Sequence, residues 1–401
     1  MVGARSNSLQ PTFSRIKEFI LFFVLVLVAG ACSTNNATDE KGPDEEEPVE
    51  KVPCELSAVL DNLEETRPDW DTIDCLAKDT PVNDYPDFAA RVLVSSQLFE
   101  QKSGLVDRHL DFWEKIRTEE SVELSSANMV AMPPYADEQG NPLEYPLTPE
   151  WHDEVLRGAI PAMMREKRSG LPVLLQNLYP NDMLGPTFES ADDFRTWMED
   201  HFLPEKEREA KAVARAGIEA YGPFPIEIEV YFNPVDQPIL NELPKAELVS
   251  LAQEWVTATL EVVRPLYEGR IVAHSYSNYK VWGEEWEDLS FPGYDEVAFS
   301  LFPECNMPTT ESYLEKQINA YVHIAKRDNI PWSIGELGIN RAYFENCGTN
   351  FDAIEADVYR AVFEAVDAAE PATMGMGISW VPGERPEVDE VIRGYYQLHT
   401  K

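Results

Sequence analysis

From about residue 87 onward, short apolar and β-branched runs alternate with longer stretches in which apolar residues follow helical spacing. Each short run predicts a strand, because runs of this length and composition are typical of buried β-structure. The predicted strands cover residues 91–96, 127–132, 172–176, 226–232, 270–276, 296–302, 332–336 and 374–380. Between two of these strands, Leu248, Leu251, Trp255, Leu260 and Val263 lie on one face of a predicted helix.

This alternation predicts a parallel sheet covered by crossover helices, which is an α/β fold. Gly170, Gly222 and Gly269 precede predicted strands, where helix-to-strand turns need unusual backbone angles. Eight β/α units over residues 87–401 match the size and count of a (β/α)8 TIM barrel. A doubly wound open sheet is the alternative, disfavoured because no Gly-rich phosphate loop follows any strand. In a barrel, the active site lies at the C-terminal ends of the strands.

The N-terminus has the order of an export signal. Basic residues precede the uncharged apolar run 19–28, and Ala-Gly-Ala-Cys-Ser follows at 29–33. Such a short run spans a bilayer poorly, which disfavours the alternative of an uncleaved anchor helix. A cysteine directly after small residues resembles the lipobox of bacterial lipoproteins. That resemblance implies removal of residues 1–31, lipid on Cys32, and a membrane-anchored protein of the bacterial cell envelope that faces the periplasm or the exterior.

Residues 32–52 are polar, acidic and Pro-containing, without apolar periodicity, so we expect a disordered, flexible tether. The whole chain has 33 Lys and Arg against 72 Asp and Glu, a formal net charge of -39. This charge argues strongly against nucleic acid or anionic lipid as the partner surface. Solubility is the simplest role for it, and we expect a monomer.

Five cysteines become four once Cys32 carries lipid, an even number in a compartment that permits disulfides. We pair Cys54 with Cys75, which closes a short N-terminal segment at 53–86, and Cys305 with Cys347. Four cysteines allow three connectivities, so the pairing is a hypothesis. The six histidines are scattered, and neither C-x-x-C nor H-E-x-x-H occurs. We therefore predict no metal site and no cofactor.

The seventh predicted strand ends on a carboxylate, in the sequence Ile-Gly-Glu-Leu-Gly at 334–338. A buried, unpaired carboxylate is costly, so Glu336 needs either a partner or a chemical task. An arginine or a backbone amide that holds the side chain is the structural alternative, and spacing alone does not decide between the two.

Three motifs in strand order resemble clan A glycoside hydrolases. Gly-Glu-x-Gly around Glu336 resembles their nucleophile strand, Trp380 resembles the eighth-strand Trp below their sugar subsite, and residues 294–303 are similar to their sixth strand. The resemblance extends from about residue 88 to the C-terminus, although each motif is short. It implies a retaining hydrolase of oligo- or polysaccharides, with Glu336 as the nucleophile.

The sequence departs from that family at the general acid. Retaining members need a second carboxyl at the end of the fourth strand, commonly in Asn-Glu-Pro, and the best register here is Asp236-Gln237-Pro238. Glutamine cannot donate a proton, and loss of general acid catalysis removes about two to four orders of magnitude in rate. Three readings stay open. Asp236 or Glu242 takes the acid role, Gln237 occupies it and limits hydrolysis, or an insertion shifts the register and makes Glu242 the acid.

Aromatic and neutral polar residues near the strand ends suit sugar recognition. Tyr276, Tyr279, Trp282 and Trp286 follow the fifth strand and offer faces that stack on sugar rings. Core packing is the alternative, which we disfavour for Trp282 and Trp286 because acidic residues surround them. Hydroxyl recognition uses neutral donors and acceptors. Candidates for this role are Gln97, Gln176, Asn177, Asn233 and His274. Each of these could instead be a satisfied buried group.

Three functional hypotheses follow. The first is a surface-tethered protein like a glycoside hydrolase, and the second is a glycan-binding lipoprotein whose glycosidase site is degenerate. The third is a structural or assembly lipoprotein whose barrel mouth is occluded by residues 133–150, a segment that could equally act as a substrate lid. The sequence specifies neither the sugar nor the linkage.

Overall fold

The computed structural model describes residues 54–61, 67–93, 124–131, 148–177, 187–224, 228, 232, 240–276, 283–303, 311–339, 354–379 and 385–400. The chain divides into two compact units, residues 1–51 and 52–401. The first unit lies outside the described residues, and so does the predicted signal with Cys32. Among the residues that are described, no helix has both the length and the apolar character needed to cross a bilayer.

The second unit is built on a parallel sheet with the strand order β1-β8-β7-β6-β5-β4-β3-β2. Its strands are β1 Ala89–Leu93, β2 Ala127–Ala131, β3 Val173–Asn177, β4 Ala220–Gly222, β5 Arg270–Tyr276, β6 Glu296–Leu301, β7 Trp332–Leu337 and β8 Gly375–Ser379. This confirms the predicted α/β class and the parallel sheet.

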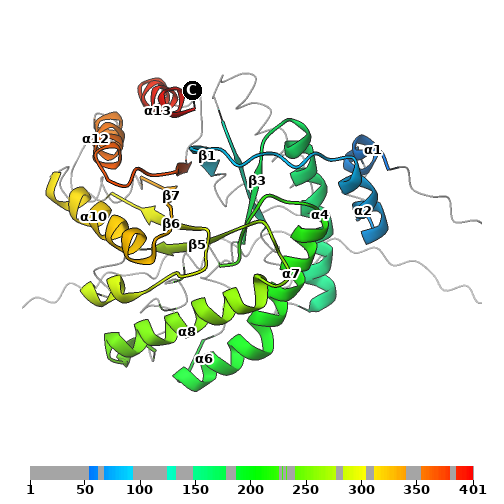
Figure 1. The fold of residues 1–401 in the computed structure, drawn as a ribbon, viewed down its shortest axis with the longest axis horizontal. Coiled ribbons are helices and arrows are strands. Elements are labelled where there is room, and N and C mark those ends of the chain that lie inside the picture. The colour runs from blue at the N-terminus through cyan, green and yellow to red at the C-terminus, as the bar shows by residue number, and fades with distance from the viewer. Residues whose placement is uncertain are drawn as a thin grey trace, which may run out of the picture. The chain divides into compact units, whose positions relative to one another are not determined.

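The sheet curls until the two strands at the ends of this order meet. The backbone N–H of Ser125, just before β2, donates to the carbonyl oxygen of Ala90 in β1 at 3.3 Å, and the Ala90 N–H donates to Ser125 Oγ at 2.8 Å. Helices surround the outside of this curled sheet (Figure 1). They are α4 Pro149–Arg168, α6 Ala191–Trp197, α7 Leu203–Arg215, α8 Lys245–Val263, α10 Glu311–Asp328, α12 Glu355–Asp367 and α13 Pro386–His399, and a π-helical segment, Met198–Phe202, joins α6 to α7.

Seven of the eight predicted strands overlap observed ones, but the fourth prediction is wrong. The strand β4 is Ala220–Gly222, and the described residues of the predicted run, Ile228 and Phe232, lie in short turns. The run 226–232 alternates apolar and polar residues as a strand does, whereas β4 spans three residues and pairs with β3 on one side and β5 on the other. Gly222 therefore ends a strand instead of preceding one, which corrects its predicted role.

Apolar side chains fill the space between the sheet and its helices and also line the inside of the sheet. The inner cluster consists of Leu174, Ala220, Val272 and Ala298, with Tyr85 packed against it. Because side chains of a strand alternate between faces, the neighbours of these residues in sequence point outward and pack under the helices. Full burial of such side chains contributes about 1.5–3 kcal/mol each.

The N-terminal segment packs on α4. It contains the helices α1 Leu56–Asp61 and α2 Trp70–Lys78, and the predicted disulfide between Cys54 and Cys75 joins them. Trp70 Nε1 donates to a carboxylate oxygen of Asp153 on α4 at 2.8 Å. The structure thus confirms one of the two predicted pairings. Cys305 and Cys347 lie outside the described residues, so their pairing stays a prediction.

Replacement of both Cys54 and Cys75 by serine is expected to lower the free energy of unfolding by about 3 kcal/mol, because the disulfide restricts the unfolded chain. Urea denaturation of the oxidised protein and of the double variant measures this difference. Equal midpoints and slopes for the two proteins would show that the crosslink does not stabilise the fold.

Candidate active site

A β-bulge in β7 turns Glu336 toward the inside of the sheet. Phe299 of β6 pairs with Ile334, and the next residue, Ser300, pairs with Glu336, so Gly335 is the extra residue. On the other side of β7, the register with β8 shifts over the same interval, between Ile334 and Leu337. Such a bulge re-aims the side chains that follow it. Without it, simple alternation would place Glu336 on the outer face with Ile334.

Glu336 is only partly exposed at this position. Burial raises the pKa of its carboxyl to about 7 from the ordinary value of 4.5. A carboxyl that is desolvated in this way is typical of sites where a side chain attacks a substrate or transfers a proton. No other described residue forms an ion pair with this carboxylate.

A chain of neutral polar groups lies on the same inner face. The amide nitrogen of Gln176 in β3 donates to His274 Nδ1 in β5, and His274 Nε2 lies 2.9 Å from Ser300 Oγ in β6. Since Nδ1 accepts a hydrogen bond, the neutral ring carries its proton on Nε2 and donates it to the serine hydroxyl. Burial, together with the charge of Arg91, lowers the pKa of His274 to about 3. The ring is therefore neutral at physiological pH.

An ionic layer lies on the inner face at the opposite ends of the strands. Arg91 in β1 is fully buried, and its Nη2 lies 3.4 Å from Glu296 Oε1 in β6. Ser333 Oγ donates to the same carboxylate oxygen, and Arg270 Nη1 approaches the other oxygen at 3.5 Å. The Arg270 guanidinium also stacks 4.5 Å from the ring centroid of Tyr85. Sequence pattern alone did not reveal this layer, although Arg91 and Glu296 each stand within an apolar strand.

The structure places several predicted site residues and corrects one of them. Trp286 is fully buried, packs edge-on against Phe299 and Tyr321, and donates from Nε1 to Ser275 Oγ at 3.2 Å. It is thus a core residue, and its prediction as a sugar-stacking surface is wrong. The acidic neighbours that suggested exposure belong to a 3₁₀ turn, Gly283–Asp288, which is amphipathic enough to bury its only tryptophan.

The other candidates divide into residues that the structure describes and residues that lie outside the described ranges. His274 and Gln176 lie buried on the inner face, as described above, and Glu242 is exposed in the 3₁₀ turn Leu240–Glu242 before α8. Tyr276 pairs with Ser300 and Asn177 with Ala131 through the backbone. The remaining candidates lie outside the described residues: Gln97, Asn233, Asp236, Gln237, Tyr279, Trp282 and Trp380. The proposed lid at 133–150 lies almost entirely outside them as well.

The corrected β4 also changes the search for a general acid. The register Asp236-Gln237-Pro238 assumed a fourth strand that ends at Phe232, but β4 ends at Gly222. Thirteen residues of chain, 223–235, therefore separate the strand end from that register. Carboxylates between β4 and α8 now include Glu227 and Glu229 besides Asp236 and Glu242.

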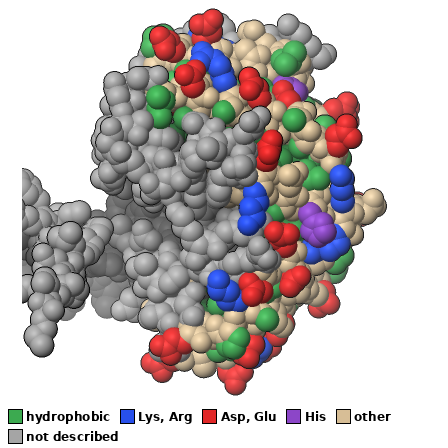
Figure 2. Space-filling view, turned by 90° about the vertical axis from the view of Figure 1, so that its left-hand side faces the viewer, with side chains coloured by type: hydrophobic (Ala, Val, Ile, Leu, Met, Phe, Trp, Pro, Cys, Tyr) green, Lys and Arg blue, Asp and Glu red, His purple; other side chains and the backbone are tan. Residues whose placement is uncertain are grey.

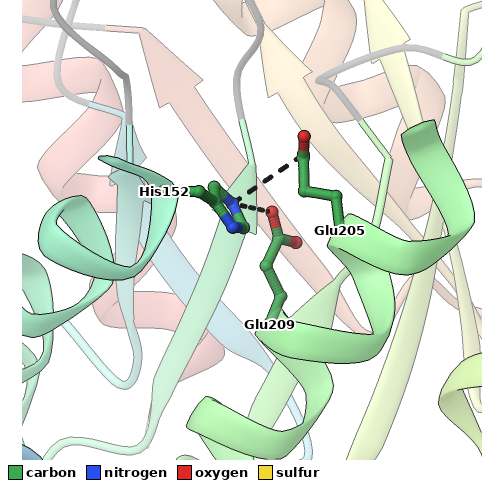
Figure 3. A group of neighbouring side chains, drawn as sticks. All are labelled: His152, Glu205 and Glu209. Atoms are coloured by element: carbon green, nitrogen blue, oxygen red, sulfur yellow. Dashed lines mark hydrogen bonds and ion pairs between the residues drawn. The ribbon is translucent and has the colours of Figure 1, made fainter. Parts of the chain in front are cut away.

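A second cluster of potential ligands lies between α4 and α7, on the outside of the sheet (Figure 3). His152 Nε2 is 2.8 Å from Glu209 Oε1 and 3.8 Å from Glu205 Oε1, and all three side chains are buried. Lys206 Nζ contacts both carboxylates, at 2.9 Å from Glu209 and 3.1 Å from Glu205. Although burial opposes the charge of Glu209, Lys206 and His152 hold its pKa at about 2. Lys206 thus supplies to these two carboxylates the positive charge that a bound metal ion would otherwise provide.

Charges on the described surface are mixed. On the face shown in Figure 2, coloured Asp and Glu side chains are scattered among Lys and Arg side chains instead of gathering into a patch of one sign. A nucleic-acid partner would require a basic stripe.

No protein-family model matches the sequence, and the search of curated proteins finds no similar sequence. Solved structures are similar to this chain at low identity. A GH113 β-1,4-mannanase has 14% identity and a TM-score of 0.47 over 78% of this chain and 99% of its own. An endo-1,4-β-D-mannanase from Thermotoga petrophila has 15% identity and a TM-score of 0.48 over 78% of this chain and 99% of its own. An exo-β-1,4-mannosidase from an Opitutaceae bacterium has 12% identity and a TM-score of 0.49 over 79% of this chain and 60% of its own. Because every TM-score is below 0.5, we base the proposed function on this chain's own residues.

The neutral state of His274 makes the stability of the fold depend on pH. Its pKa is about 3 in the folded chain and near 6.5 when unfolded, so only the unfolded chain takes up a proton between these values. The contribution of the neutral His274 ring to the free energy of unfolding is complete above pH 6.5. It is lost as the pH falls below that value, at about 1.4 kcal/mol per pH unit. Between pH 7 and pH 4, the free energy of unfolding measured by denaturation should depend less steeply on pH in His274→Gln than in the original chain. The exposed His323→Gln serves as the control and should keep the original slope.

Proposed function

We propose that this chain is a glycoside hydrolase on a (β/α)8 barrel, with Glu336 as the nucleophile of a retaining mechanism. The observation that supports the proposal is the bulge, whose register puts Glu336 on the inner face at the C-terminal end of a parallel strand, where burial raises the pKa of its carboxyl and no other described residue forms an ion pair with it. The Gly-Glu-x-Gly motif and Trp380, which follows β8 in the sequence, support a sugar as the substrate. The N-terminal sequence supports a lipid tether on Cys32 in the bacterial cell envelope.

In this mechanism the Glu336 carboxylate attacks the anomeric carbon and the glycosidic C–O bond breaks, which leaves the sugar esterified to the enzyme. Water then hydrolyses the ester and releases the sugar with its original configuration. A second carboxyl must protonate the departing oxygen when that oxygen is a poor leaving group. The segment between β4 and α8 is the proposed source of this acid, from among Glu227, Glu229, Asp236 and Glu242.

Aryl glycosides with activated leaving groups test the nucleophile separately from the acid, because a phenolate with a low pKa departs without protonation. The purified protein should hydrolyse at least one such glycoside from a panel of hexosides in both anomeric forms. Glu336→Gln should reduce kcat/KM by about three orders of magnitude or more. Activity that survives this substitution would remove Glu336 from the mechanism.

The pH profile on the same substrates distinguishes a nucleophile from an acid. An attacking carboxylate must be ionised, so kcat/KM should rise about tenfold per pH unit up to about pH 7 and level off above it. A kcat/KM on these substrates that stays level from pH 5 to pH 7 would show that attack does not need the ionised Glu336.

The glycan-binding alternative is a defined outcome of these assays. If oligosaccharides bind and protect the protein from heat while no glycoside is cleaved, the site recognises sugars without hydrolysis. If activated glycosides react and natural oligosaccharides stay intact, the site lacks its acid, as the Gln237 reading implies.

A further inference from the structure

The extra residue of the bulge that aims Glu336 has no room for a side chain, because another side chain fills that space. A β-carbon at Gly335 would lie 2.6 Å from His274 Nε2 and 2.8 Å from the β-carbon of Ala298. These distances are well inside van der Waals contact, so no residue with a side chain fits at 335 unless its neighbours move. The imidazole therefore occupies the volume that a side chain on the bulged residue would need.

The His274 ring cannot easily leave this position. Gln176 is hydrogen-bonded to Nδ1 and Ser300 to Nε2, so a partner at each of the two ring nitrogens fixes the plane of the ring. The ring is fully inside the sheet, where rotation would break both hydrogen bonds in a site that water does not reach. Ser300 is also the residue that pairs with Glu336 across β6 and β7. The same serine thus connects the ring to the strand position of the carboxylate.

We propose that His274 is a positioning residue for Glu336, because its locked ring fills the bulge and holds Gly335 and Glu336 in the shifted register. The catalytic consequence rests on the proposed function, whereas the structural claim does not. If the ring is removed, β7 loses the contact that keeps the extra residue in place, and water gains access to the inner face below the carboxylate.

The experiment uses the full-length purified protein with carbon-13 in its glutamate side chains, and the Glu336 resonance is assigned by its loss in Glu336→Gln. In His274→Ala, the titration midpoint of Glu336 should fall from about 7 toward 4.5, because water enters the emptied space. Amide hydrogen exchange at residues 335–337 should accelerate at least about tenfold. Ser300→Ala keeps the ring and removes one of its hydrogen bonds, so it serves as the matched control and should show a smaller change in both measurements.

A second substitution approaches the same contact from the opposite side. Gly335→Ala leaves the histidine intact but forces its new methyl group into the ring, and it should shift the Glu336 titration and speed exchange as His274→Ala does. If His274→Ala does not fold, His274→Asn empties most of the ring volume and retains a polar group. Unchanged titration and exchange in folded His274 and Gly335 variants would overturn the proposal. These measurements need no turnover, so a chain that hydrolyses no glycoside fails the proposed function and still tests the positioning role.

Discussion

The proposed chemistry depends on one backbone irregularity, the extra residue at Gly335 in β7. It converts a strand whose apolar side chains face the helices into one that presents a carboxylate to the interior. Glu336 then shares the inner face with Ser300 and His274, while Leu337 returns to the outer core. A regular strand would bury the carboxylate among apolar side chains, at a cost of several kcal/mol for an unpaired charge. The bulge instead puts the carboxylate on the inner face with Ser300 and His274, where it stays partly exposed.

The interior beneath Glu336 keeps the His274 ring uncharged. Arg91 and Glu296 form the ionic layer, and in the register of β5 with β6 Glu296 pairs with Val272, whereas His274 pairs with Ala298 two residues further along. The field of Arg91 adds to burial in suppressing protonation of His274, so the ring stays a neutral donor to Ser300. Charge is thus concentrated at two levels, the ionic layer and the carboxylate at the mouth. The polar chain between them carries hydrogen bonds without net charge.

The sequence predicts much of this fold because its strands obey simple periodicity. The β5 prediction, 270–276, coincides with the observed Arg270–Tyr276, and the predicted helix face at 248–263 lies in α8. The strand β4 was missed because three residues, Ala220–Gly222, carry no periodic signal, whereas Ile228 and Phe232 beyond it do. What makes β4 a strand is its pairing with β3 and β5, which is a tertiary effect that local pattern does not contain.

The site was predicted only in part. The position of Glu336 at a strand end follows from sequence, but its direction does not, because alternation alone points it outward. A signal for the bulge was present: the apolar residues Trp332, Ile334 and Leu337 are spaced by two and then by three. The partnership of Gln176, His274 and Ser300 joins three strands that are distant in sequence, so no local pattern could reveal it. Trp286 misled because an amphipathic turn surrounds one buried ring with acidic neighbours.

Covalent trapping tests the central claim most directly. Fluorosugars with an activated leaving group slow the release of the glycosyl ester, so a retaining nucleophile accumulates the sugar as a stable adduct. Incubation with fluorinated glucosides and mannosides, followed by peptide mass spectrometry, identifies the labelled residue. Our account predicts a single adduct on Glu336 that is absent in Glu336→Gln. An adduct on any other carboxylate would contradict it.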